Sequence, residues 1–210
     1  MYLSKLTLDL SLPEIRRLLV NPYMLHKAIF RAFPDAGQGG TGRILYRLDT
    51  QTAVDNTCLL VQSEKEPAWN KAELLKNGTL HLESKLFNPV FSVDQVFYFR
   101  LRANPTIKKF ISNRPVRLGI IKENDQLDWL KRKGLAGGFS ILDYLIIPEG
   151  MLKDKKRTDS EEYAFSLISV RFEGKLKVTD TALFRQIVES GLGSAKGFGF
   201  GLLSLAPVRD

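Results

Sequence analysis

The chain has 210 residues, of which 44% are hydrophobic and 26% charged. This length suits one large domain or two small ones of about 100 residues, either of which can bury a core. Lys and Arg outnumber Asp and Glu by 31 to 23, which gives a net charge of +8. This balance favours a polyanionic partner, and nucleic acid outranks a membrane surface because no long basic amphipathic segment stands out.

Cysteine content and the N-terminus bear on the compartment. Cys58 is the only cysteine, which excludes an intramolecular disulfide and a cysteine-based zinc site. Residues 1–10 alternate as a strand does and lack the basic start and apolar block of a signal peptide. No apolar run approaches the roughly 20 residues that a membrane span needs. We therefore expect a cytoplasmic protein with no membrane partner.

The first half of the chain predicts the element order βαββαβ. After the strand at 1–10, Asn21 and Pro22 are typical of a helix N-cap and first helical residue, and they predict a helix from about Pro22 to Phe33. Two strands, a short helix and a further strand are expected next, at 43–49, 57–63, 67–75 and 79–87.

The second half predicts the same order. An aromatic strand at 96–102 is followed by a basic loop and then by a helix that ends at Gly134. Two strands around a polar tip, a helix capped by Asp180 and a last strand follow, at 138–148, 164–178, 180–190 and 201–206. Two such units predict an α+β protein with tandem ferredoxin-like domains, as in RNA-recognition proteins, at residues 1–90 and 91–210.

A glycine-rich segment precedes the last strand, with five glycines in the eleven residues 191–201. Glycine lets backbone N–H groups approach a phosphate closely, and lysine adds a charge, so the segment predicts an anion cradle. Its candidate contacts are Gly191, Gly193, Lys196, Gly199 and Gly201. The segment lacks the Gly-Lys-Ser/Thr of a Walker A loop, and it matches only the opening of the RNP1 pattern. At least one of Phe198 and Phe200 is expected to be buried.

Positive charge concentrates between residues 96 and 133, where ten Lys and Arg stand against three Asp and Glu. A basic face for nucleic acid and a merely solvated face both fit this run. The tip at 153–162 balances its charges, although Lys155, Lys156 and Arg157 cluster on it. Such a tip could enter a nucleic-acid groove or stay a solvated loop. Interleaved aromatic residues such as Trp129 could stack on bases, but this spacing is more typical of a core.

The predicted first helix has two faces on a 3.6-residue wheel. The apolar face holds Met24, Leu25, Ala28, Ile29, Ala32 and Phe33, and the other holds Tyr23, His26, Lys27, Phe30 and Arg31. We expect the second face to point away from the core. An imidazole can exchange a proton near neutral pH, and a phenol and cations can stabilise charge on a pentacoordinate phosphate. Tyr23, His26, Lys27 and Arg31 therefore fit phosphodiester cleavage without a metal.

Two other candidates for catalysis are weaker. His81 lies in an alternating strand without comparable neighbours, and we expect it to be exposed. Asp35, Glu83 and Lys85 satisfy the PD…ExK pattern of restriction-type nucleases, but that pattern is short and Asp35 falls in a glycine-rich loop. No spacing of histidine or cysteine indicates a metal site.

Five motifs in order resemble those of the CRISPR repeat-processing endoribonucleases, most closely the CasE subunit of the Cascade complex. They are Met-Tyr-Leu-Ser-Lys at 1–5, Asn-Pro-Tyr-Met-Leu-His at 21–26, Phe-Arg-Leu-Arg-Ala-Asn-Pro at 99–105, Ile-Lys at 121–122 with Trp-Leu-Lys-Arg-Lys at 129–133, and Gly-Phe-Gly-Leu-Leu-Ser-Leu-Ala-Pro at 199–207. The glycine-rich segment also has the Gly-apolar-Gly pairs of that family's loop. The likeness spans nearly the whole chain.

The resemblance implies tandem ferredoxin-like domains and a metal-independent RNase that needs no cofactor. It would cut precursor CRISPR RNA at the foot of the repeat stem-loop by attack of the upstream 2′-hydroxyl, leaving a 2′,3′-cyclic phosphate and a 5′-hydroxyl. The family's tyrosine and histidine fall on Tyr23 and His26, while Lys27 and Arg31 are added from the wheel.

The resemblance also implies the partners. The enzyme would be a monomer on its own, would keep its product in essentially a single turnover, and would join the other Cascade subunits with it. The second domain would hold the RNA stem, with first choices Arg100, Arg102, Lys108 and Lys109 and, at the tip, Lys155, Lys156 and Arg157. The alternative is a non-catalytic RNA-binding scaffold subunit of the same complex.

Overall fold

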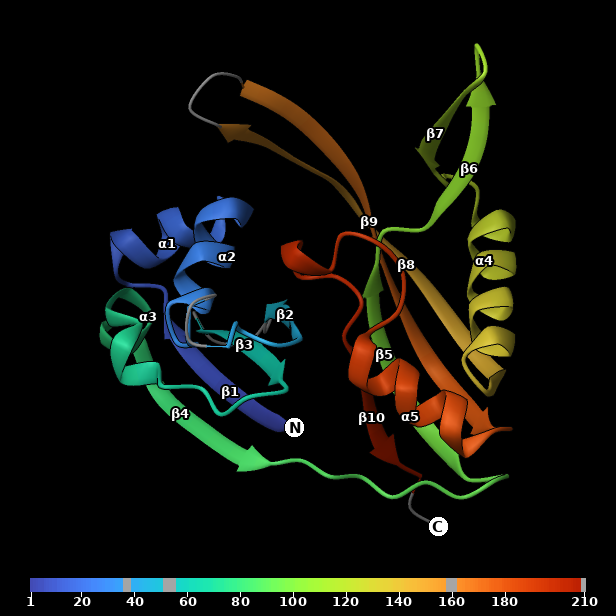
Figure 1. Cartoon of the computed structure of the whole chain (residues 1–210), viewed down its shortest axis with the longest axis horizontal. Helices are drawn as coiled ribbons and strands as arrows, with labels where there is room; N and C mark the ends of the chain where they lie inside the picture. The colour runs from blue at the N-terminus through green and yellow to red at the C-terminus, as the bar shows by residue number, and fades with distance from the viewer. Residues whose placement is uncertain (36–38, 51–55, 158–161, 209–210) are drawn as a thin grey trace. The chain divides into compact units, whose positions relative to one another are not determined.

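The computed structural model describes residues 1–35, 39–50, 56–157 and 162–208. Its contacts divide the chain into two compact units (Figure 1). Unit 1 comprises Met1–Pro89, Asp154–Ala164 and Gly197–Gly199, and unit 2 comprises Val90–Lys153, Phe165–Lys196 and Phe200–Asp210. A short piece of the glycine-rich segment therefore belongs to unit 1, although it lies more than 100 residues beyond the rest of that unit's sheet.

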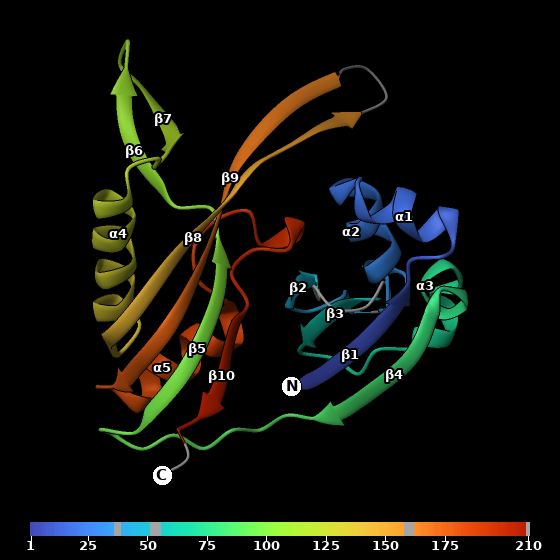
Figure 2. The same ribbon diagram turned by 180° about the vertical axis from the view of Figure 1, so that it is seen from behind.

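Unit 1 is built on a four-stranded antiparallel sheet in the order β2-β3-β1-β4. Its strands are β1 (Tyr2–Asp9), β2 (Ile44–Thr50), β3 (Asn56–Ser63) and β4 (Thr79–Leu86). The helices are α1 (Pro13–Leu19), α2 (Pro22–Phe30) and α3 (Glu73–Asn77), with a 3-10 turn η2 (Trp69–Lys71). Figure 2 shows the same elements from behind. The connectivity is the ferredoxin-like βαββαβ that the sequence predicted, with α1 as an addition.

The core of unit 1 lies between its helices and its sheet. Leu6 and Leu8 of β1 pack with Ile15 of α1 and with Leu25 and Ile29 of α2. The alternating pattern of β1 explains why one of its faces is buried, and the spacing of Leu25 and Ile29 explains which face of α2 is inside. Apolar packing therefore sets the position of α2 in the unit, and the polar residues of α2 do not take part in that packing.

One of the first helices was not predicted, and two predictions for the other were wrong. The sequence did not predict α1, because a helix of seven residues is marginal alone and forms here by burying Ile15 and Leu18. The helix α2 ends at Phe30 instead of Phe33, since the backbone N–H groups of Ala32 and Phe33 bond three residues back instead of four. Met24, expected in the core, is 48% exposed.

Unit 2 repeats the arrangement, with a sheet in the order β10-β5-β9-β8. Its strands are β5 (Val96–Ala103), β8 (Phe139–Arg157), β9 (Glu162–Val178) and β10 (Leu203–Pro207). Its helices are α4 (Glu123–Ala136) and α5 (Thr181–Ser190). Asp180 caps α5 as predicted, because its Oδ1 accepts from the backbone N–H groups of Ala182 and Leu183, both at 2.9 Å.

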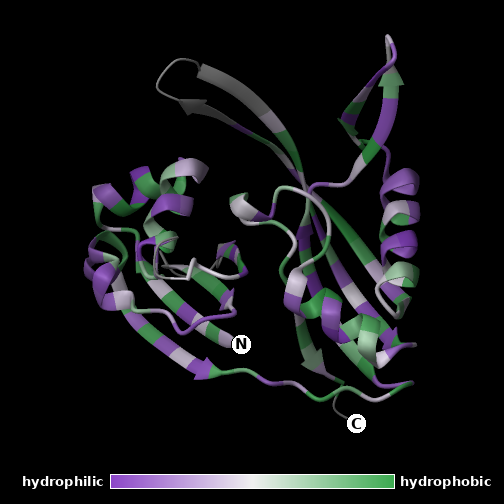
Figure 3. Cartoon of the chain, viewed as in Figure 1, coloured by the Kyte–Doolittle hydropathy of each residue, from purple (hydrophilic) through white to green (hydrophobic). Residues whose placement is uncertain are grey.

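A two-stranded hairpin interrupts the repeat between β5 and α4. The expected basic loop is instead β6 (Thr106–Ile111) paired with β7 (Arg114–Gly119). Hydrophilic and hydrophobic residues are mixed along the hairpin and along α4 (Figure 3). Ser112 and Asn113 form the turn with positive φ, as two-residue hairpin turns require. Much of the positive charge of residues 96–133 is therefore displayed on a hairpin.

The helix α4 runs on to Ala136, although Gly134 was expected to stop it. A Cβ at Gly134 would lie 2.8 Å from the backbone oxygen of Phe139. Glycine is therefore needed at this position because the start of β8 approaches the helix closely, and not because the helix ends there.

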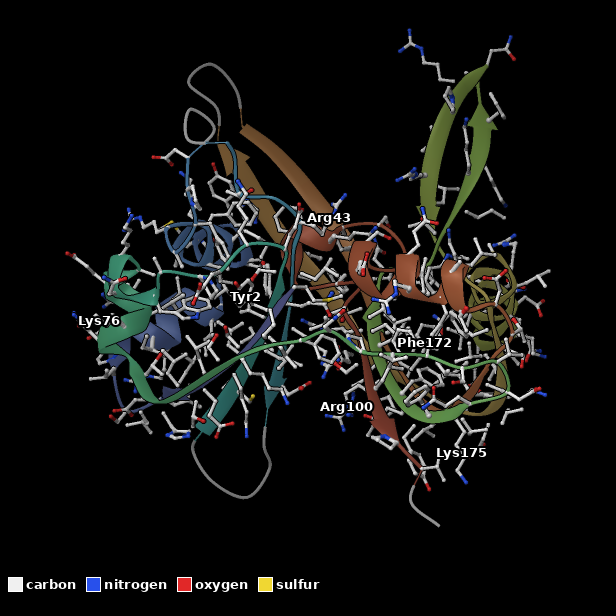
Figure 4. The ribbon with its side chains drawn as sticks, turned by 60° about the horizontal axis from the view of Figure 1, so that its bottom comes forward. Tyr2, Arg43, Lys76, Arg100, Phe172 and Lys175 are labelled. Atoms are coloured by element: carbon white, nitrogen blue, oxygen red, sulfur yellow. The ribbon has the colours of Figure 1, made fainter. Side chains whose placement is uncertain are left out.

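Aromatic residues form much of the core of unit 2. Trp129 is 2% exposed and stacks on Phe172 with a centroid distance of 5.9 Å, so it is not available to stack on bases. Phe97 and Phe99 are also buried, whereas Tyr98 is 47% exposed. Figure 4 shows Phe172 and Arg100, which lie on neighbouring strands and on opposite faces of the sheet by their register.

None of the helices in the described ranges combines the length and the low polarity that crossing a bilayer demands.

Candidate active site and basic surface

The helix α2 presents Tyr23 and His26 one turn apart. Asn21 caps this helix, with its Oδ1 accepting from the Met24 backbone N–H at 2.9 Å, and Pro22 occupies the first helical position. Leu25 lies between Tyr23 and His26 in the sequence, and its burial fixes which face of α2 carries these two side chains. The ammonium of Lys27 lies 4.6 Å from the centroid of the Tyr23 ring, a cation–π contact. Arg31 is exposed just beyond the helix.

His26 is half-buried, and its ring is packed on two sides. The Phe30 ring lies 4.0 Å away between centroids, and the Phe198 ring lies 6.4 Å away. A Cβ built on Gly197 would lie 3.4 Å from Cε1 and 3.5 Å from Nδ1 of the imidazole. The ring is therefore outside the apolar core, as predicted, but it is held against Gly197 and Phe198.

The two ring nitrogens of His26 are not equivalent. Nδ1 is buried against the Gly197 backbone and makes no hydrogen bond of ordinary geometry with the described residues. A nitrogen that solvent cannot reach cannot exchange a proton with a substrate, which leaves Nε2 for that role. Burial lowers the pKa of the imidazole below its ordinary value of 6.5, and the Gly197 backbone opposes this shift. The neutral, proton-accepting ring is therefore favoured near neutral pH.

The glycines of the glycine-rich segment mainly set its backbone conformation, and most of them are not exposed. Gly191, Gly193, Gly199 and Gly201 all have positive φ. Gly191, Gly199 and Gly201 are buried, and the N–H groups of Gly191 and Gly201 bond to the carbonyls of Ile187 and Arg102. These two N–H groups are not available to a phosphate. Gly193, which is only half-buried, is the glycine best placed for the predicted anion contact.

Lys196 and Phe200 of the same segment have structural contacts. The Nζ atom of Lys196 donates to the carbonyl of Ser190 at 2.8 Å, at the C-terminal end of α5 where a cation is stabilised. Phe200 is fully buried, which confirms the expectation that one of the two phenylalanines is inside. Lys196 and Phe198 lie in a 3-10 turn, η3 (Lys196–Phe198).

Arg100 and Arg102 are held in ion pairs on one face of the unit 2 sheet. Arg102 Nε lies 2.6 Å from Glu149 Oε2, and Arg100 Nε lies 2.7 Å from Glu173 Oε1. The Arg102 side chain is only 18% exposed, and its guanidinium also lies over the Phe200 ring at 5.1 Å. A phosphate would have to compete with these carboxylates, so we expect both arginines to contact RNA more weakly than unpaired cations would.

A basic pocket lies where the hairpin β6–β7 meets α4 and the glycine-rich segment. Its volume is about 440 Å³, and it is lined by Thr106, Ile107, Lys108, Arg117, Trp129, Arg132, Lys133, Gly193 and Ser194. Four of these residues are cationic, and none of the described residues that line it is acidic. Arg117 lies opposite Lys108 in the hairpin. The pocket gathers charge from three separate stretches of chain.

The sequence placed only Lys108 and Gly193 of this pocket among its candidates. Arg117, Arg132 and Lys133 were counted as charge but not selected, because the hairpin that brings Arg117 opposite Lys108 was expected to be a loop. Lys109 is exposed on β6. The backbone of Lys155, Lys156 and Arg157 ends β8, but their side chains lie outside the described part of the chain.

The residues of the metal-dependent alternative have ordinary surroundings. Asp35 is exposed in a loop, and Glu83 pairs with His81 at 2.8 Å on the exposed strand β4. This confirms His81 as an exposed strand residue. Among the described residues, no three His, Cys, Asp or Glu side chains gather as a metal site would require.

Comparisons with known proteins agree with this arrangement. The chain is 33% identical over 217 residues to the CRISPR-associated endoribonuclease Cse3 of Thermus thermophilus, covering 99% of this chain and 100% of that protein. It is 28% identical to the Cascade subunit CasE of Escherichia coli, covering 89% and 92%. A solved structure of Cse3 bound to a 19-nucleotide RNA superposes with a TM-score of 0.85 at 31% identity, covering 99% of this chain and 100% of that one.

A family model agrees over nearly the whole chain. The model described as CRISPR associated protein matches residues 1–207. The chain belongs to this family.

Proposed function

We propose that this protein is the endoribonuclease that cuts precursor CRISPR RNA within its repeats and then keeps the guide RNA as a subunit of Cascade. Two relatives support this proposal by name, one as a CRISPR endoribonuclease and one as a Cascade subunit. The observation that carries it in this chain is His26, half-buried against Gly197 and one helical turn from Tyr23. Because the proposed substrate is newly transcribed CRISPR RNA, we infer that the protein works in the cytoplasm.

The chemistry follows from the state of His26. Its lowered pKa favours a neutral ring, whose Nε2 takes the proton of the ribose 2′-hydroxyl upstream of the cut. The 2′-oxygen attacks phosphorus, the bond from phosphorus to the 5′-oxygen breaks, and that oxygen receives a proton from water, while His26 returns its own proton to the solvent. The products are a 2′,3′-cyclic phosphate and a 5′-hydroxyl. Tyr23 and Lys27 lie where a phenol and an ammonium can stabilise the charged transition state, with Arg31 beyond them.

The basic pocket and the exposed hairpin lysines supply the binding. Lys108, Arg117, Arg132 and Lys133 converge without an acidic neighbour among the described lining residues. Phosphate neutralisation by such cations provides affinity that does not depend on base sequence. We infer that the pocket and Lys109 hold the backbone of the repeat stem, while α2 carries the reaction.

The substitution His26→Ala tests the catalytic assignment, and His81→Ala is the matched control because these are the only two histidines. Loss of proton transfer should slow single-turnover cleavage by on the order of 10²-fold or more, while affinity for the repeat stays nearly unchanged. The control should cleave like the parent. If His26→Ala also cleaves like the parent, His26 is not catalytic, and if the parent binds RNA without cutting it, the protein is a scaffold.

Chelation tests the metal-independent chemistry. Cleavage by the parent should continue in EDTA, because the proposed proton transfer and charge stabilisation use side chains alone. Activity that disappears in EDTA and returns with a divalent cation would instead direct attention to Asp35, Glu83 and Lys85.

A further inference from the structure

Tyr46 is a buried tyrosine whose hydroxyl is bonded to the glycine-rich segment. It lies on β2, is 1% exposed, and belongs to the core of unit 1. Its hydroxyl donates to the backbone oxygen of Gly197 at 2.8 Å, across 151 residues of sequence. A buried tyrosine hydroxyl needs a hydrogen-bond partner, and this one joins the core of the sheet to a segment from the far end of the chain.

The ring of Tyr46 makes a second contact with the same segment. A Cβ at Gly199 would lie 3.2 Å from Cε2 of Tyr46, tighter than ordinary packing. Gly199 also has a φ of +82°, which side chains rarely adopt. Tyr46 thus holds Gly197 by its hydroxyl and fits against Gly199 by its ring.

The anchored segment is the one that packs on the imidazole. Gly197 lies against Cε1 and Nδ1 of His26, and the Phe198 ring lies 6.4 Å from the imidazole between centroids. The imidazole also contacts Phe30, one turn further along α2, with 4.0 Å between ring centroids. The orientation of the imidazole therefore depends on the segment Gly197–Gly199, which Tyr46 holds in place.

We propose that Tyr46 is a positioning residue for His26, which holds Gly197–Gly199 against the imidazole and so aims Nε2 at the substrate. As far as cleavage is concerned, this role rests on the proposed function. A displacement of about 1 Å in a reacting group can cost up to 10²-fold in rate, so an anchor distant from the RNA can control the chemistry. The contact itself exists whether or not the protein cleaves RNA.

The pKa of His26 depends directly on the contact between the imidazole and Gly197–Gly199. Burial is the larger cause of the lowered His26 pKa, and the Gly197 backbone is the smaller, opposing cause. The charged neighbours Lys27 on α2 and Arg31 at its C-terminal cap are not among the causes, and Gly197–Phe198 adds no titratable side chain. Weakening the contact with Gly197–Gly199 should therefore expose the imidazole ring and raise the pKa of His26 toward its ordinary value.

The test is the substitution Tyr46→Phe, which keeps the ring and removes the hydroxyl. Imidazole NMR signals of the full-length chain are followed against pH, and His81 on β4 serves as an internal reference because the chain has only two histidines. We expect the His26 midpoint to move to higher pH while the His81 curve is unaffected. Single-turnover cleavage should fall by about tenfold with unchanged RNA affinity. A Tyr98→Phe control, with an exposed ring, should match the parent.

A second variant approaches the same contact from the other side. Gly199→Ala would press on Tyr46, whereas Gly150→Ala has a similar φ of +85° and open space around it. Both strain the backbone, but only Gly199→Ala should shift the His26 titration. An unshifted His26 curve in both Tyr46→Phe and Gly199→Ala overturns the positioning role. A parent that cleaves no repeat RNA refutes the proposed function instead, and the NMR result still decides the role of Tyr46.

Discussion

The two units share one strand order and differ in what they add to it. Unit 1 adds a short helix before α2 and encloses a histidine between Phe30 and a distant glycine segment. Unit 2 adds a hairpin and gathers four cations around an open pocket. Proton transfer needs one group whose pKa is shifted by partial burial, whereas phosphate binding needs several charged groups close to solvent. Under the proposed function, this difference favours cleavage by unit 1 and RNA affinity from unit 2.

The strongest way to break this division is to change the RNA. A 2′-deoxy sugar just upstream of the cut removes the attacking hydroxyl and should stop cleavage, a loss on the order of 10³-fold or more, since the proposed mechanism uses no other nucleophile. Binding should persist, because phosphates and not that hydroxyl meet the cations of unit 2. Electrophoresis of cleavage products and filter binding of the same RNA measure the two effects. Cleavage of the deoxy RNA would show that the nucleophile is not the 2′-oxygen.

The next largest effect is expected from the pocket. Changing Arg117, Arg132 and Lys133 together to Ala should weaken repeat binding by on the order of 10²-fold at low salt and reduce the salt slope by about 2 to 3. Cleavage of RNA that is already bound should proceed at the parent rate. Fluorescence anisotropy across a salt series gives affinity and slope together.

The matched control removes the same charge from unit 1. Arg17, Lys71 and Lys76 are exposed cations on α1, η2 and α3. If their replacement by Ala weakens binding as much as the pocket variant does, affinity comes from net charge and not from the pocket. If neither variant weakens binding, the RNA does not bind at the pocket.

Sequence patterns could predict most of the fold. Alternation in residues 1–10, the Asn21–Pro22 cap and the Asp180 cap each act over a few neighbouring residues, so they can be read locally. The helix α1 and the hairpin β6–β7 could not be predicted in this way. The first exists because of burial against the sheet, and the second has cations and apolar residues mixed in a pattern that also fits a loop.

The candidate site was predictable only in part. Tyr23, His26 and Lys27 fall together because helical spacing is local. The contact of Gly197 with His26 and of Tyr46 with Gly197 joins residues 151 or more positions apart, and no short pattern carries such information. For the same reason the sequence assigned Arg102 to RNA, although Glu149 on another strand already pairs with it.

A smaller effect separates Tyr23 from the binding surface. Tyr23→Phe keeps the ring beneath Lys27 and removes the phenol, so it should slow cleavage by about tenfold through loss of one hydrogen bond to the transition state. Affinity should change by less than twofold if unit 2 supplies it. Single-turnover kinetics at saturating protein measures the rate without binding effects. A change in affinity equal to the change in rate would move Tyr23 from catalysis to binding.

The smallest and sharpest effect is the response to pH. Below the pKa of His26 the ring is protonated and cannot accept a proton, so a general base predicts a rate that rises with pH and levels off. Because burial lowers this pKa from 6.5, the half-maximal rate should occur below pH 6.5. Lys and Arg stay charged through this range, so affinity for the 2′-deoxy RNA should be flat from about pH 5.5 to 8. A rate that instead falls as pH rises through 6.5 would show that the protonated imidazole acts, as a general acid, and that the neutral ring does not start the reaction.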